Sequence, residues 1–87
     1  MIILNVKKCE LSLKKNRVIT LDEDSSKMLA IMSNKKKITA RELSKQLYGS
    51  TIYFFRIWNN VKFLREYLNI YRGRNGYKLL DNIYITY

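Results

Sequence analysis

The side chains in this sequence that could do chemistry are mainly cations. Lysine and arginine number 17 against 7 aspartates and glutamates, which gives the 87-residue chain a net charge of +10. Two of the cations, Arg72 and Arg74, stand in the stretch YRGRNGY, where Gly73 and Gly76 favour a tight turn between two strand-like runs. So large an excess of charge indicates a polyanionic partner, with nucleic acid ahead of an anionic membrane surface. The alternative is that the charge serves solubility alone.

Residues suited to catalysis or metal binding are scarce. The sequence has no histidine, its single cysteine is Cys9, and it contains no phosphate-binding glycine loop and no carboxylate pair at helical spacing. One cysteine allows neither an internal disulfide nor a Cys/His zinc site. We therefore expect no enzyme activity, no metal and no cofactor. The opening MIILNV is too short for a signal peptide or a membrane span, so a cytoplasmic location is expected.

The first third of the chain is expected to form strands. Residues 11–21 alternate apolar and polar side chains around the polar break KKN, which predicts a hairpin. Asp22 then predicts the N-cap of a helix over about 23–33. Thr39 and Glu42 form a capping box for a second helix, over about 40–48.

A third and longer helix is expected over about 52–68. Its buried stripe, from helical spacing, would comprise Phe54, Ile57, Trp58, Val61, Leu64 and Leu68. A second hairpin follows over about 70–80, with Asn75-Gly76 as its turn, and the terminal IYITY offers one more strand. This order predicts one α+β domain over residues 1–87. The expected fold is a winged helix-turn-helix with an N-terminal β-hairpin, three helices and a C-terminal β-hairpin wing.

Four segments in the same order resemble the winged-helix DNA-binding domain of OmpR/PhoB-type transcription regulators. They are VITLDEDSSKMLAIM, ITARELSKQLYG, VKFLREYL and YRGRNGYKL. The resemblance spans about residues 11–80 and implies a stand-alone domain with no receiver domain. It implies sequence-specific duplex DNA binding by a small transcriptional regulator, with the third helix in the major groove and Arg72 near the minor groove. Arg65 would tie the fold together.

The chain also departs from that family pattern. The wing tip is one residue longer, and the connection between the second and third helices is about three residues shorter, than the family pattern that it resembles. Phe63 stands where the family often has a basic or polar residue. Phe55 and Phe63 could contact thymine methyls, pack under the wing or form a protein interface.

The residues expected to contact DNA come from three places in the sequence. They are Lys37, Thr39 and Arg41 beside the second helix, Arg56, Asn59, Asn60, Lys62 and Phe63 on the third helix, and Arg72 and Arg74 at the tip of the wing. The run Lys35, Lys36 and Lys37 either forms a solvated turn or clamps phosphate at the N-terminus of the second helix.

The expected partner is double-stranded DNA, on which two copies of the chain would pair, and no membrane is expected. The alternative function is a winged-helix protein–protein adaptor that binds another regulator or RNA polymerase. RNA binding on a basic winged helix is a third hypothesis.

Overall fold

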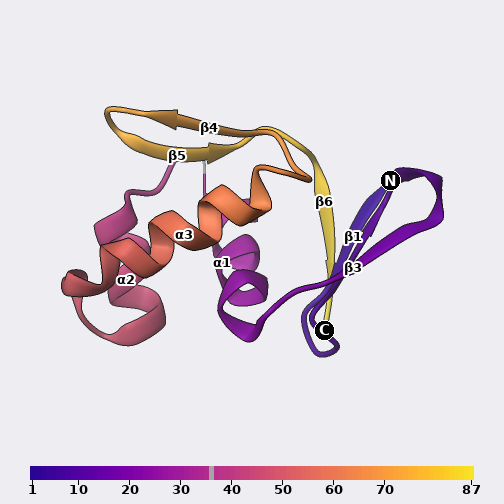
Figure 1. Cartoon of the computed structure of the whole chain (residues 1–87), viewed down its shortest axis with the longest axis horizontal. Coiled ribbons are helices and arrows are strands. Elements are labelled where there is room, and N and C mark those ends of the chain that lie inside the picture. The colour runs from indigo at the N-terminus through magenta and orange to yellow at the C-terminus, as the bar shows by residue number, and fades with distance from the viewer. Residues whose placement is uncertain (36) are drawn as a thin grey trace.

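The computed structural model describes residues 1–35 and 37–87 (Figure 1). Within these ranges the chain is α+β, with three α-helices and six strands in two sheets, as the sequence predicts at this coarse level. Lys36, one of the three lysines considered for phosphate, lies outside the described residues. In chain order the elements are β1 (Ile2–Asn5), β2 (Glu10–Leu13), β3 (Arg17–Thr20), α1 (Glu23–Ser33), α2 (Ala40–Tyr48), α3 (Phe54–Leu64), β4 (Ile70–Gly73), β5 (Gly76–Leu79) and β6 (Ile83–Thr86).

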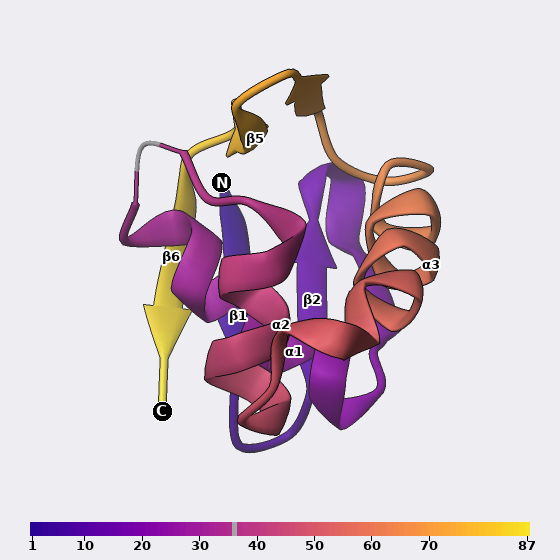
Figure 2. The same cartoon turned by 90° about the vertical axis from the view of Figure 1, so that its left-hand side faces the viewer.

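The first sheet has the strand order β3-β2-β1-β6. β2 and β3 pair antiparallel, which confirms the predicted N-terminal hairpin. The predicted C-terminal strand also forms, but it pairs parallel with β1 at the other end of the chain. Figure 2 shows the helices lying over one face of this sheet. That face contributes Leu4 and Leu11, both fully buried, to a core shared with the helices.

Local capping bonds start α1 and α2 where the sequence predicts. The Ser25 N–H donates to Asp22 Oδ1 at 2.6 Å, and the Glu42 N–H donates to Thr39 Oγ1 at 3.1 Å. α2 stops at Gly49, which adopts a left-handed conformation with φ 76° that glycine reaches without a steric cost. Both helices keep the predicted bounds.

The prediction for α3 is wrong at both ends. Instead of joining the helix, Thr51–Tyr53 forms a separate 3₁₀ turn, because the Tyr53 N–H donates to Ser44 Oγ of α2 at 3.0 Å. At the other end, the N–H groups of Tyr67 and Leu68 both donate to the Leu64 carbonyl oxygen. The last turn thus tightens and the regular helical ladder ends at Leu64.

The predicted buried stripe of α3 is only partly confirmed. Ile57, Val61 and Leu64 are buried, and so is Leu68 in the turn beyond the helix. Phe54 and Trp58 are each 41% exposed, so their assignment to the core is wrong. Both lie at the edge of the stripe beside the second sheet, whose two strands leave part of each ring uncovered.

The second sheet is the antiparallel hairpin β4–β5, which confirms the predicted second hairpin. It is fastened to the segment before α2 through Ile38, a contact that the sequence did not predict. The Tyr77 N–H donates to the Ile38 carbonyl at 2.8 Å, and the Ile38 N–H donates to the Tyr77 carbonyl at 3.0 Å. The backbone passes so close that a Cβ at Gly76 would collide with the Ile38 carbonyl oxygen.

The turn of this hairpin differs from the prediction by one residue. Gly73 pairs with Gly76, which leaves Arg74 and Asn75 as the two turn residues in place of Asn75-Gly76. Gly76 belongs to β5 with φ 113°, a conformation that residues with a side chain rarely adopt, and its lack of a Cβ permits the close approach to Ile38. Of the two arginines expected at the tip, only Arg74 is there.

Candidate nucleic-acid interface

The hairpin β4–β5 lies above α3 in both views (Figures 1 and 2). A groove of about 470 Å³ runs between them. Its lining comprises Trp58, Val61, Lys62, Arg65, Glu66 and Arg72. Three cations face one carboxylate there, so the groove favours a negatively charged ligand.

Arg72 spans the boundary between α3 and the hairpin. Its guanidinium carbon lies 5.6 Å from the centroid of the Trp58 ring, within cation–π range. Strand pairing places Arg72 opposite Tyr77, which is buried, so Arg72 stands on the hairpin face that looks toward the core. The expectation that Arg72 projects from the tip is therefore corrected, because its charge lies beside α3.

The tip of the hairpin gathers cations from two distant parts of the sequence. Lys37, Tyr71 and Arg74 line a hollow of about 330 Å³ together with Gly73, Asn75 and Gly76. The Tyr71 ring covers Gly73 so closely that a Cβ there would collide with it. Ile38 brings Lys37 to this place, because its bonds to Tyr77 hold the start of α2 against the hairpin.

A third hollow, which we call the aromatic hollow, opens between the starts of α2 and α3 and the hairpin. Its volume is about 340 Å³, and it is lined by Ala40, Phe54, Phe55, Trp58, Arg72 and Tyr77. The rings of Phe54 and Phe55 are in contact, with centroids 4.5 Å apart. Trp58 and Arg72 line this hollow and the charged groove alike. The sequence did not predict the aromatic hollow, because helical spacing alone does not distinguish an aromatic side chain at the edge of the buried stripe from one in the core.

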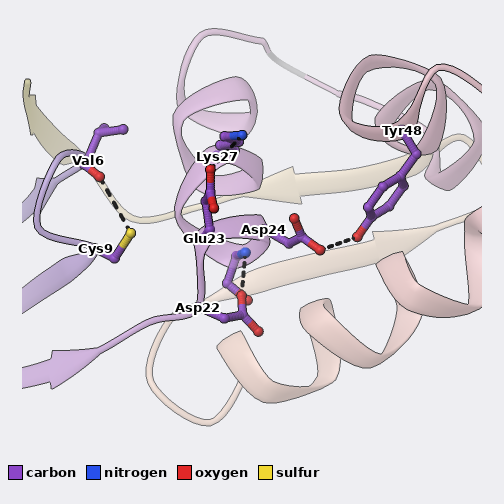
Figure 3. Close-up of polar contacts among 8 residues, drawn as sticks. Val6, Cys9, Asp22, Glu23, Asp24, Lys27 and Tyr48 are labelled. Carbon is purple, nitrogen blue, oxygen red and sulfur yellow. Dashed lines mark hydrogen bonds and ion pairs between the residues drawn. The ribbon is translucent and has the colours of Figure 1, made fainter.

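Arg56 faces away from the hairpin, toward α2. Its guanidinium carbon lies 5.5 Å from the Tyr48 ring centroid and 5.3 Å from that of Tyr53. The Tyr48 hydroxyl in turn donates to Asp24 Oδ2 at 2.6 Å (Figure 3). Burial is the larger cause, and this hydrogen bond the next, that together raise the pKa of Tyr48 to about 12. These contacts tie α1, α2 and the start of α3 together and hold Arg56 away from the groove.

Phe63 and Asn60 share the side of α3 that Arg56 occupies, since residues 56, 60 and 63 repeat at helical spacing. The Phe63 ring packs edge-on against Tyr67, with centroids 5.5 Å apart, and the Arg17 guanidinium covers Tyr67 at 5.3 Å. Asn60 is half-buried. These three predicted contact residues are therefore separated from the groove beside the hairpin.

The remaining residues predicted to contact DNA differ in how accessible their side chains are. Asn59 is exposed on the outer side of α3, and Lys62 lines the groove. Arg41 is exposed in the first turn of α2, whereas the Thr39 oxygen is engaged as the N-cap of that helix. Thr39 also lies 3.2 Å from Glu42 Oε1, so a carboxylate stands beside the position considered for phosphate.

Arg65 differs from its expected role. Within residues 1–35 and 37–87 it makes no side-chain hydrogen bond and no ion pair, and the ion pair in this part of the chain joins Lys27 to Glu23. Arg65 is exposed and lines the groove. It is thus a free cation among the described residues and an addition to the predicted site.

Comparison with known proteins adds no family to this description. No protein-family model matches the sequence, and no curated protein matches it. In the described part of the chain, no helix combines the length and apolar character needed to cross a bilayer.

Proposed function

We propose that this chain is a small transcriptional regulator that binds duplex DNA sequence-specifically. The proposal assigns a winged helix-turn-helix of the OmpR/PhoB type, with α2 and α3 as the helix-turn-helix and β4–β5 as the wing. The observation that carries it is the groove between α3 and the hairpin, where Lys62, Arg65 and Arg72 converge. Cations on a helix and on an adjacent hairpin would contact the two phosphate backbones that border a DNA groove.

The dimensions of α3 support this assignment. Its 11 residues give a rod about 16 Å long and about 10–12 Å across, which enters a major groove about 12 Å wide. Asn59 and Lys62 stand on accessible sides of α3. Asparagine pairs with adenine edges, and lysine pairs with guanine or phosphate. We assign these two residues to base recognition.

The remaining cations are assigned to the DNA backbone and the minor groove. Arg74 and Lys37 at the hairpin tip would reach beyond the bases that α3 contacts. Arginine is favoured in a minor groove narrowed by A·T pairs, because its weakly hydrated charge meets an enhanced negative potential there. Arg74, as the residue at the tip, takes the minor-groove role that the sequence suggested for Arg72.

The test is selection of bound sequences from a random duplex library at near-physiological salt, followed by salt titration. A sharp motif is expected. If about five to eight phosphates are engaged, log K should fall against log salt with a slope of roughly −5 to −7. Lys62→Ala should weaken binding, whereas Lys8→Ala removes the same charge from an exposed turn between β1 and β2 and should have little effect. Absence of binding to any duplex at low salt would exclude the proposal.

One observation favours the adaptor as a second candidate. Ile52 is 68% exposed and Phe55 is 64% exposed at the junction of α2 and α3, a concentration of apolar surface typical of protein interfaces. Under this alternative the chain binds RNA polymerase or another regulator through the junction. Ile52→Ser would then weaken that complex, and duplex DNA would neither bind nor compete.

A further inference from the structure

The single tryptophan of the chain lies at the surface, in the aromatic hollow. Trp58 and Phe54 are each 41% exposed, and Phe55 beside them is more exposed still. Three large rings that converge on one hollow leave apolar area in water that a ligand could cover. A ligand with a planar, apolar part fits this surface best, because aromatic rings stack on flat partners.

The charge around the hollow narrows the class of ligand. Arg72 stacks on Trp58, and the adjoining groove adds Lys62 and Arg65, with Glu66 as its one carboxylate. A second copy of this chain is disfavoured as the occupant, because each copy carries a net charge of +10. A nucleotide combines a flat base with an anionic phosphate and matches both halves of the site.

We propose that the aromatic hollow binds an unpaired base of DNA, with the flanking phosphates on Arg72 and on Arg65 of the adjoining groove. This inference rests on the proposed function and names its substrate more closely, as duplex DNA that contains an unpaired base. A base inside a fully paired duplex is stacked on both faces and must be extruded first, whereas a bulged base is already available. The hollow therefore favours DNA with a bulge over the paired sequence.

Trp58 itself reports on this binding, since it is the chain's only tryptophan. The experiment titrates the protein with three DNAs of one sequence: the paired duplex, the duplex with one bulged adenine, and the same bulge with the base removed. The bulged adenine should quench Trp58 emission and bind most tightly. The abasic bulge keeps the backbone distortion and should lose the quenching.

Variants of Trp58 distinguish the loss of base stacking from a general loss of structure. Trp58→Ala should weaken binding of the bulged DNA by about 5- to 150-fold, the range for base–aromatic stacking, and should affect the paired duplex less. Trp58→Phe keeps a ring and should retain much of the preference. Tyr84→Ala removes an exposed ring from β6, which belongs to the other sheet, and should change nothing.

Each outcome decides a different point. Equal affinity for the base-containing and abasic bulges, without quenching, would overturn the inference, while salt-dependent binding of paired duplex would leave the proposed function intact. Binding of bulged DNA without binding of paired duplex would overturn the proposed function and support the inference. Equal affinity for the matching bulged RNA would overturn the assignment to DNA. Absence of binding to every nucleic acid would overturn both.

Discussion

Replacement of Gly76 by alanine should detach the β4–β5 hairpin from the start of α2. Gly76 has φ 113°, where an L-residue is strained, and a Cβ there would meet the Ile38 carbonyl oxygen and the Thr39 nitrogen. The main chain cannot yield locally, because the next residue, Tyr77, makes both backbone hydrogen bonds to Ile38. The substitution thus strains the backbone at residue 76 and also breaks the Ile38–Tyr77 pairing.

The expected cost follows from these two contributions. Backbone strain at a sparsely populated conformation costs about 1–3 kcal/mol. Each of the two hydrogen bonds contributes about 0.5–1.5 kcal/mol net, so their joint loss adds about 1–3 kcal/mol. The total of about 2–6 kcal/mol is a large part of the stability of a domain this size, for which about 5–15 kcal/mol is typical.

Gly49→Ala is the matched control. Gly49 also has a positive φ, 76°, but a Cβ added there meets nothing within 4 Å. Its loss should be limited to strain, about 1–2 kcal/mol. Denaturant titration of the two variants gives the difference, and hydrogen exchange of the Tyr77 amide reports the pairing directly. Equal losses in the two variants, with the Tyr77 amide still protected, would refute the claim that Ile38 holds the hairpin.

Three further predictions concern the core, the Tyr48 contact and the division of roles at the interface. Leu64→Ala should destabilise the fold by about 2–5 kcal/mol in denaturant titration, because Leu64 is fully buried; a loss under about 0.5 kcal/mol would contradict its place in the core. The Tyr48 hydroxyl should ionise well above the usual pH for a tyrosine in a phenolate absorbance titration, because burial and Asp24 raise its pKa from 10.0 to about 12. Folding favours the protonated hydroxyl of Tyr48. Its contribution to folding stability is therefore fully present below pH 10.0 and is lost as the pH rises toward about 12. Asp24→Asn should lower the pH at which Tyr48 ionises. The last prediction uses one panel of duplexes in which the core and the flanks vary separately. Asn59→Ala should change the preferred core sequence, whereas Arg74→Ala should weaken binding most on duplexes with A·T-rich flanks. Unchanged affinity of Arg74→Ala for every duplex would show that the hairpin tip does not contact DNA.

The parts of the fold that sequence predicts well are those fixed by bonds between near neighbours. Asp22 and Thr39 each bond a backbone N–H three residues ahead, so α1 and α2 begin where the sequence indicates. The start of α3 depends instead on a distant side chain, since Ser44 of α2 accepts a hydrogen bond from the Tyr53 N–H. Helical periodicity carries no information about that contact, and the predicted helix therefore began too early.

Pairings between distant segments were likewise beyond the sequence pattern. The run IYITY was recognised as a strand, but its parallel partner β1 lies at the opposite end of the chain. Ile38 reads as an ordinary loop residue until its bonds to Tyr77 are seen. For the candidate site, the residue types were sufficient to identify the cations. Their grouping depended on the fold, which brought Arg65 and Trp58 into the site and left Arg56 outside.

The position of Arg72 depends on these distant contacts in a specific way. Side chains alternate between the two faces of a strand, so a shift of one residue in the hairpin register would move Arg72 to the opposite face. The register has Gly73 opposite Gly76, and Gly76 is required because the strand passes against Ile38. A backbone contact before α2 thereby places an arginine over Trp58 of α3. Arg72 and Arg74 are two residues apart in sequence but occupy different surroundings, one in the groove and one at the tip, and the proposed function gives them different parts of the DNA to contact.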